Sequence, residues 1–369
     1  MFQIRGLSPS ALLTLMRQWP IRPQKTQHVF LCIADHWEPK WNRPTRQVEN
    51  SRVARWVREY PALAARFTDS LGRHPQHTFF YPAEEYEPEH LDALAGICRR
   101  GFGDVEVHLH HDRDTADGTR EKLCHFTETL FERHGLLRKD AEGRLRYAFI
   151  HGNWALDNSR PDGRWCGVNN ELSILIETGC YADLTMPSAP DQCQTATVNA
   201  VYYATDDPLR PKSHDSGLRV RVGGQQPTDT LLMIQGPLAL DWNNRKWGIL
   251  PRIENGDLTA RRPPTLQRLT LWMQANVRVS GRDDWRIVKL HTHGAQESNM
   301  GMLLGAPMCD FHGALASFAA ERHWFRYYYV TASELASLVH AAERGVSDPS
   351  TLLAHPPVVA ARGPAAASE

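Results

Sequence analysis

The sequence lacks the features that mark several large classes of protein. The chain contains 42 Lys and Arg residues and 42 Asp and Glu residues, so its formal net charge is zero. It therefore lacks the net positive charge that would attract nucleic acid or an anionic membrane. No uninterrupted apolar stretch is long enough to span a bilayer. Arg5, Arg17 and Gln18 interrupt the apolar core that a signal peptide would need. These absences predict a soluble cytoplasmic protein, with neither nucleic acid nor a membrane as a partner.

Cysteine is scarce and shows no pattern. The seven Cys residues are an odd number and contain no Cys-x-x-Cys pair, which is typical of reduced thiols in a reducing compartment. Histidine, in contrast, is frequent, with 18 residues in a chain of 369. This imbalance favours a metal site that is built from histidines rather than from paired cysteines.

Short apolar strands alternate with helices along most of the chain. We expect strands at 29–33, 77–81, 105–109, 147–150, 182–186, 285–290 and 326–330. We expect helices at 8–18, 44–67, 89–100, 120–134, 171–178, 265–277 and 333–344, with one more at 301–304 or 311–322. This alternation is typical of a parallel sheet or a βα barrel, and it predicts the α/β class.

The alternation is interrupted between residues 195 and 264, where Gly and Pro are frequent and no long helical period occurs. We expect an insertion of hairpins and loops here that packs over the mouth of the barrel. The sequence thus predicts a single domain over 1–354. An Ala- and Pro-rich tail follows over 355–369, and its composition predicts disorder.

Three of the predicted strands end in histidines and acids. Residues 34–38 read Ala-Asp-His-Trp-Glu, residues 108–112 read His-Leu-His-His-Asp, and residues 291–293 read His-Thr-His. Because the C-terminal ends of parallel strands gather on one face of a sheet or barrel, these segments predict one site. His and Asp are ligands for Zn²⁺ and also common general acids and bases.

The His-x-His spacing places two imidazoles on the same face of a strand. His108 and His110 can therefore share a metal ion. His291 and His293 repeat the spacing, so one of them can ligate the metal while the other transfers a proton. Hydrogen-bonded histidines without a metal are the alternative for both pairs.

A polar and aromatic loop follows the strand at 147–150. Its candidate substrate-binding residues are His151, Asn153, Trp154 and Asp157. A Trp ring can stack on a sugar ring, while Asn and Asp can hydrogen-bond to hydroxyl groups. The loop is therefore a candidate binding segment for a saccharide, with an ordinary capped turn as the alternative.

With these segments in place, the chain resembles the polysaccharide deacetylase superfamily, carbohydrate esterase family four. The first motif of that family, Thr-Phe-Asp-Asp-Gly, is similar to Ile-Ala-Asp-His-Trp at 33–37, and its second strand, Ala-Thr-Phe-Phe, is similar to His-Thr-Phe-Phe at 77–80. The family's His-x-x-x-His motif is similar to His108-x-x-x-Asp112 or to His110-x-x-x-Asp114, and its final Leu-His is similar to 290–291. The Arg-Pro-Pro-Tyr loop of the family is absent, and 151–154 occupies its place.

The resemblance implies a distorted βα barrel that removes an N-acyl group, acetyl or formyl, from a sugar or a sugar-containing metabolite. It makes Asp35 the catalytic base and His291 the general acid, with His293 assisting or ligating. The expected ligands of a divalent metal, Zn²⁺ in the first place, are His36, His108, His110 and Asp112. Two alternatives remain: a catalytically inactive carbohydrate-binding barrel, and a metal-dependent amidohydrolase acting on a small molecule that is not a sugar.

Overall fold

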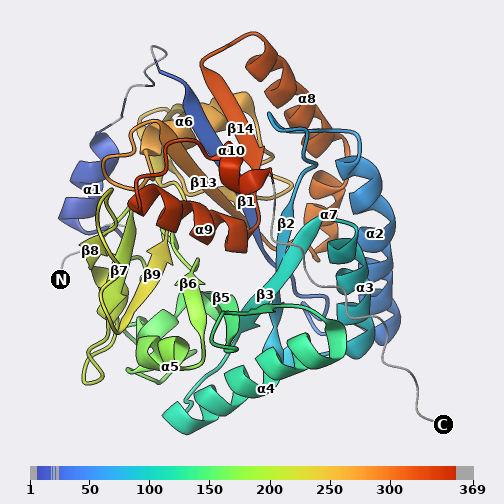
Figure 1. Cartoon of the computed structure of the whole chain (residues 1–369), viewed down its shortest axis with the longest axis vertical. Helices are drawn as coiled ribbons and strands as arrows, with labels where there is room; N and C mark the ends of the chain where they lie inside the picture. The colour runs from blue at the N-terminus through green and yellow to red at the C-terminus, as the bar shows by residue number, and fades with distance from the viewer. Residues whose placement is uncertain (1–5, 18, 20, 22–24, 355–369) are drawn as a thin grey trace.

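A mostly parallel mixed β-sheet forms the centre of the molecule, and helices alternate with its strands (Figure 1). The computed structural model describes residues 6–17, 19, 21 and 25–354. Along the sheet the strands follow the order β12-β13-β1-β2-β3-β5-β6-β9-β7-β8, with β14 paired to β1 and β4 paired to β5. The chain is therefore an α/β protein, as the alternation of predicted elements indicates.

The strands of the main sheet are β1 Gln27–His36, β2 His77–Pro82, β3 Gly103–Leu109, β4 Arg138–Lys139, β5 Leu145–His151, β6 Cys180–Asp183, β7 Val201–Thr205, β8 Leu218–Arg219, β9 Thr230–Ile234, β12 Asp257–Leu258, β13 Trp285–Thr292 and β14 Phe325–Tyr329. A separate two-stranded sheet contains β10 Ala239–Lys246 and β11 Leu250–Glu254.

The α-helices are α1 Pro9–Met16, α2 Arg46–Ala64, α3 Pro88–Arg99, α4 Ala116–His134, α5 Glu171–Glu177, α6 Leu266–Ala275, α7 Glu297–Leu303, α8 Ala306–Ala320, α9 Ala332–Glu343 and α10 Ser350–Leu353. Each helix and strand that the sequence predicts has a counterpart here. Local chemistry sets several ends: Ser8 caps α1 by accepting a hydrogen bond from the backbone N–H of Ala11, and Gly135 ends α4 with a φ of 65°.

Strand β1 lies at the middle of the parallel region. Along one side it pairs with β13, from His28 to Asp35. Along the other side its first half pairs with β14 and its last three residues pair with β2. All three partners are parallel to β1, so the ends of β1 and β13 that carry the histidines point the same way.

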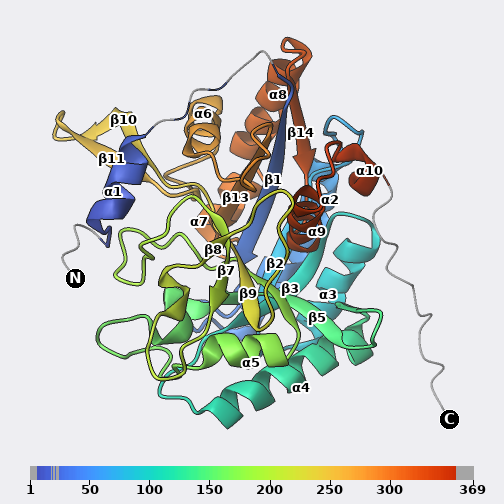
Figure 2. The same ribbon diagram turned by 60° about the vertical axis from the view of Figure 1, so that its left-hand side comes forward.

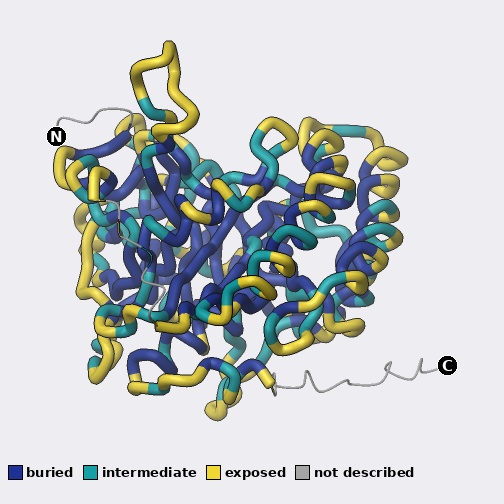
Figure 3. The backbone as a smooth tube through the Cα atoms, turned by 90° about the horizontal axis from the view of Figure 1, so that it is seen from above, coloured by how far each residue is buried: buried dark blue, intermediate teal, exposed yellow. Residues whose placement is uncertain are grey.

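The two faces of the sheet contact different layers. Val29 and Leu31 of β1 belong to an apolar cluster that includes Trp56 of α2 and Leu94 of α3. The alternate residues of the strand, such as Phe30 and Cys32, belong to a second cluster that contains residues of α9. Figure 3 shows the buried backbone filling the middle of the molecule, with the exposed segments around it.

The segment from 195 to 264, which the sequence predicts to be an insertion of hairpins and loops, contributes several strands to the main sheet. Strand β9 joins the main sheet in parallel beside β6, and β7 pairs antiparallel with β9. Strand β12 continues the sheet beside β13. Only β10 and β11 form a separate hairpin, which lies beside α1 (Figure 2).

An isolated parallel bridge links Arg221, after β8, to Ser280, before β13. No helix in the described part of the chain is long and apolar enough to cross a membrane. The predicted disordered tail, 355–369, lies outside the described residues.

Candidate metal centres

Five ligand-type side chains converge where β1, β3 and β13 end. They form two groups of three that share Glu38, and we refer to all five as the strand-end cluster: His36, Glu38, His108, His110 and His293. His36 is the last residue of β1 and His108 lies in β3, while the other three follow the ends of their strands by one or two residues. The parallel arrangement thus brings together residues as far apart in the chain as His36 and His293, which are separated by 257 positions.

Glu38 is the centre of this cluster. Its Oε1 atom lies 3.2 Å from Nε2 of His108 and 3.3 Å from Nε2 of His110, and its Oε2 atom lies 3.6 Å from Nδ1 of His293. The ring centroid of His36 lies 4.8 Å from those of His108 and His293. Ligand atoms around a tetrahedral Zn²⁺ with bonds of about 2.0–2.3 Å are separated by about 3.3–3.6 Å. The cluster therefore has the spacing of a metal site.

His108 and His110 direct Nε2 toward Glu38, and hydrogen bonds of the opposite ring nitrogen, Nδ1, fix the orientation of both rings. Nδ1 of His108 donates a hydrogen bond to the carbonyl of Ile150 at 2.7 Å, and Nδ1 of His110 donates to Oε1 of Glu84 at 2.6 Å. Such bonds to a carbonyl or carboxylate are the usual outer contacts of metal-binding histidines, because they fix the tautomer and point Nε2 at the ion.

Charge and burial keep two of these side chains, Glu38 and His36, in the form that binds a cation. Burial alone would raise the pKa of Glu38, but hydrogen bonds with His108, His110 and His293 bring that pKa well below its ordinary value. Burial, together with the neighbouring histidines, holds the pKa of His36 well below its ordinary value. An ionised carboxylate and a neutral imidazole are the forms that a metal binds.

One side of the strand-end cluster is accessible. The side chains of His110 and His293 are 30% and 31% exposed, whereas that of His108 is fully buried. The Trp154 ring centroid lies 6.5 Å from that of His36, and Trp154 is half-buried. A ligand can therefore approach the cluster beside His110, His293 and Trp154.

The two residues expected to transfer protons are both buried. Asp35 lies on the face of β1 opposite to His36, where its carboxylate accepts hydrogen bonds from Nε2 of His77 at 2.8 Å and from the backbone N–H of Gly294 at 2.6 Å. His291 is 5% exposed, and its Nδ1 has no hydrogen-bond partner among the described residues. Both residues lie next to the cluster in sequence but away from its accessible side.

The remaining predicted residues have separate environments. Asp112 is exposed and accepts a hydrogen bond from the backbone N–H of Trp165 at 2.6 Å. Asn153 is half-buried, and Asp157 is buried with Oδ2 accepting from the backbone N–H of Ser213 at 2.6 Å. His151, the fourth residue predicted to bind substrate, belongs instead to another group of ligand-type side chains.

That second group is closed to solvent. We refer to it as the buried cluster: His111, His151, Cys166 and Glu171. One ligand atom from each residue lies within 4.8 Å of the others, all four residues are buried, and such a group could hold a metal ion. His151 is the last residue of β5 and Glu171 is the first residue of α5, so the buried cluster lies between the sheet and a helix.

The spacing of Glu38 is a signal in the sequence for its place in the cluster. Glu38 follows His36 by two positions, which is the same spacing as in His108-x-His110 and His291-x-His293. Glu84 and Cys166 gave no comparable signal, because neither lies at the end of a predicted strand. The general observation that seven cysteines form no Cys-x-x-Cys pair remains true, yet one of them joins a group of metal-ligand type.

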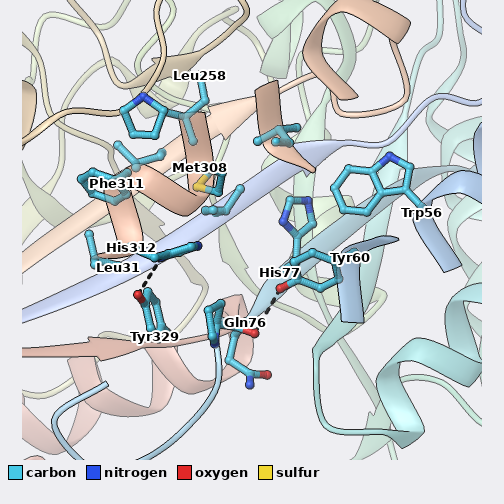
Figure 4. Close-up of a pocket in the computed structure, with 15 residues that line it drawn as sticks. Leu31, Trp56, Tyr60, Gln76, His77, Leu258, Met308, Phe311, His312 and Tyr329 are labelled. Atoms are coloured by element: carbon cyan, nitrogen blue, oxygen red, sulfur yellow. Dashed lines mark hydrogen bonds between the residues drawn. The ribbon is translucent and has the colours of Figure 1, made fainter. Parts of the chain in front are cut away.

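An apolar pocket lies beside Leu31 and Ile33 of β1 (Figure 4). Trp56, Met308 and Phe311 are among the residues that line it. His77, the partner of Asp35, is also part of its lining. The pocket is therefore separated from the accessible side of the strand-end cluster by β1 itself.

No protein-family model matches this sequence, and no curated protein matches it.

Proposed function

We propose that this protein is a metal-dependent hydrolase that removes an N-acyl group from a sugar or a sugar-containing metabolite, with the strand-end cluster as its metal centre. The observation that carries the proposal is the convergence of four histidines on Glu38 at the strand ends, with two of the four reachable from solvent. Catalytic metal sites combine buried protein ligands with one open position in this way.

The residues present fit a divalent metal by their own chemistry. The Glu38 oxygens and the facing imidazole nitrogens are 3.2–3.6 Å apart, and Nδ1 of His293 has no hydrogen-bond partner in the described part of the chain. Nitrogen and carboxylate ligands suit Zn²⁺. When bound, the metal supplies a positive charge that polarises the acyl carbonyl.

The metal would take one of the two accessible histidines, His110 and His293, as a ligand, and the other would carry out the proton transfers of hydrolysis. They are the two histidines of the cluster that a substrate can reach, and a general acid or base must lie within hydrogen-bond distance of the atom it serves. Glu84 holds His110 by accepting hydrogen bonds from its Nδ1 and from its backbone N–H. Asp35 and His291 would then act as positioning residues, since Asp35 anchors Gly294 beside His293.

The loop after β5 supports a sugar as the substrate. Asn153, Trp154, Asp157 and Asn158 all have positive φ values, between 49° and 55°. Non-glycine residues in this conformation cost free energy and gather at functional sites. The strained loop presents the Trp154 ring near His36, where it can stack on a sugar ring.

The fold that we propose is a distorted βα barrel of the polysaccharide deacetylase type. The Arg221–Ser280 bridge supports it, because the bridge joins the chain after β8 to the chain before β13 and so brings the two ends of the strand order together.

The test is release of acetate or formate from N-acetyl- and N-formyl-hexosamines by the purified protein. We expect release with Zn²⁺ present, loss of release after chelation and recovery when Zn²⁺ is restored. The His108→Gln variant should lose both the metal and the activity. His125→Gln is the matched control, because His125 is exposed on α4 and lies outside both clusters.

Two results would contradict the proposal. Saturable binding of the sugars without release by the metal-loaded protein would instead support a carbohydrate-binding barrel. Release that survives removal of the metal and the His108→Gln substitution would place the chemistry elsewhere.

A further inference from the structure

The buried cluster is closed to solvent, whereas the strand-end cluster is accessible on one side. The side chains of His111, His151 and Glu171 are at most 1% exposed, and Cys166 is fully buried. Oε1 of Glu171 lies 3.2 Å from Nε2 of His111 and 3.4 Å from Nε2 of His151, and Oε2 of Glu171 lies 3.4 Å from Sγ of Cys166. These separations match the roughly 3.3–3.6 Å between ligand atoms of a tetrahedral Zn²⁺ site.

The hydrogen bonds around the two histidines assign a proton to Nδ1 of each ring and leave both Nε2 atoms directed at Glu171. Nδ1 of His111 bonds to a carboxylate oxygen of Asp114 at 2.9 Å, and Nδ1 of His151 bonds to the carbonyl of Gly152 at 2.6 Å. Both partners can only accept, so both Nδ1 atoms carry the proton. When both rings are neutral, each carries a bare lone pair on Nε2.

These lone pairs face each other at close range. The two Nε2 atoms of His111 and His151 are 2.7 Å apart, and both lie near the ionised oxygen of Glu171. Three acceptors that converge in a site closed to water require a cation between them, because buried unpaired acceptors are costly. A proton can satisfy two of the three, whereas a metal ion satisfies all three together with the sulfur.

The fourth ligand is a buried thiol with a backbone donor directed at its sulfur. Sγ of Cys166 receives the backbone N–H of Asn158 at 3.2 Å. A metal that binds a cysteine deprotonates it, and a backbone donor then stabilises the negative sulfur. Four protein ligands around a site with no accessible position are characteristic of a structural zinc site, because a catalytic site keeps one position open.

We propose that His111, His151, Cys166 and Glu171 bind a structural Zn²⁺ that fastens the loop after β5. Glu171 also accepts the backbone N–H of Asp157 at 2.5 Å, and Cys166 accepts that of Asn158. Both of these loop residues have positive φ values. The ligands of the buried site therefore hold the strained backbone that carries Trp154, so this zinc positions the loop without touching the substrate.

Cobalt substitution distinguishes this site from the strand-end cluster. Only the buried cluster contains a cysteine, so a thiolate-to-cobalt charge-transfer band in the near ultraviolet reports on Cys166 alone. We expect the band in the Co²⁺-loaded protein and its complete loss in Cys166→Ser. Cys124→Ser is the control, because Cys124 lies half-buried on α4 outside both clusters, and its variant should keep the band.

Metal content gives the second readout. If both clusters are filled, the metal content should fall from about two ions to about one per chain in Cys166→Ser. In His108→Gln the charge-transfer band should remain while the other ion is lost. If the strand-end cluster is not a hydrolase centre, the charge-transfer band of the buried cluster is still expected. The proposed hydrolase function and the proposed structural zinc site can therefore be disproved independently.

The wild-type protein provides a test that does not depend on a variant folding. X-ray absorption at the zinc edge should detect one sulfur at about 2.3 Å for the ion in this site. The proposal is overturned if wild-type protein supplied with Zn²⁺ or Co²⁺ shows neither sulfur coordination nor the charge-transfer band. It is also overturned if the band persists in Cys166→Ser.

Discussion

The carboxylate of Asp35 accepts a hydrogen bond from Nε2 of His77 at 2.8 Å, on the face of β1 opposite to His36. Its other oxygen accepts the backbone N–H of Gly294, which directly follows His293. Asp35 is fully buried. These contacts connect the end of β1 to the start of β2 and to the turn after β13, and they give Asp35 a role in holding three segments together.

Asp35→Asn should therefore destabilise the protein. The substitution keeps the shape of the side chain but removes the charge that His77 and Gly294 contact, and the free energy of unfolding should decrease by about 1–3 kcal/mol. Denaturant unfolding and acetate release are measured on the same preparation. If the variant keeps its full stability and loses all hydrolysis, Asp35 is the catalytic base that the family resemblance implies.

Glu38→Gln should empty the strand-end cluster. Glutamine has nearly the same size but lacks the negative charge that faces His108, His110 and His293. Outer contacts of metal ligands alone are worth 10–100-fold in affinity, so removing a ligand's charge should weaken binding by more than about 100-fold. Metal titration measures the effect. Glu89→Gln is the control, because the Glu89 side chain is 74% exposed, and equal metal binding in both variants would exclude Glu38 as a ligand.

Trp154→Ala should raise KM for the sugar substrate while the metal content stays unchanged. Loss of a stacked ring is expected to cost roughly tenfold in binding, equivalent to about 1.4 kcal/mol. Steady-state kinetics across a substrate series measure it, with Trp247→Ala as the control because Trp247 is 75% exposed on the β10–β11 hairpin. An unchanged KM would remove Trp154 from the binding surface.

His312 should make the stability of the fold sensitive to acid. It is buried against Phe67 and Phe311, with Nδ1 2.7 Å from the hydroxyl of Tyr329 (Figure 4), and burial lowers its pKa to about 3. In the unfolded chain an imidazole takes up a proton below about pH 6.5. Between these pH values the unfolded state binds more protons, so stability falls as the pH falls.

The contribution of His312 is measured by comparing the wild type with His312→Gln, which cannot titrate. Between pH 6.5 and 5, the wild type should lose about 1 kcal/mol per pH unit more than the variant does, and the difference in slope approaches about 1.4 kcal/mol per unit at the lower end. Denaturant unfolding at several pH values gives both slopes. Identical slopes would show that His312 is protonated in the folded protein at those pH values.

Trypsin should cut first at the tip of the β10–β11 hairpin, where Arg245 and Lys246 are exposed. Because β7, β9 and β12 belong to the main sheet, the two pieces should remain associated after cleavage. Size-exclusion chromatography of the cut protein tests this. Release of residues 195–264 as a stable fragment would contradict it and would make this segment an independent unit.

Much of the fold could be predicted because the local patterns are strong. The apolar run before Asp35 and the run before His291 are strands in the structure. Because parallel strands gather their C-terminal ends on one side, the sequence also predicts that His36, His108 and His293 lie close together, as they do. The place of β9 beside β6 could not be predicted in this way. It depends on a long-range pairing that no local period of the sequence encodes.

The alternation of side chains along a strand explains why some predicted site residues lie outside the strand-end cluster. Asp35 and His36 are adjacent in sequence, so alternation places them on opposite faces of β1. His111 and His151 likewise point away from the strand-end cluster, and their partners Cys166 and Glu171 come from a loop and a helix. A group assembled from a strand, a loop and a helix has no regular spacing in the sequence.

The two clusters differ in when the growing polypeptide can complete them. All four ligands of the buried cluster lie between residues 111 and 171, so they exist before the second half of the chain has been translated. The strand-end cluster needs His293, and β1 needs β13 as its neighbour. A chain that stops short of residue 293 can complete only the first of the two, because it contains Glu38, His108 and His110 but lacks the fifth residue of the strand-end cluster. The complete metal centre assigned to hydrolysis is therefore restricted to molecules whose synthesis has passed that point.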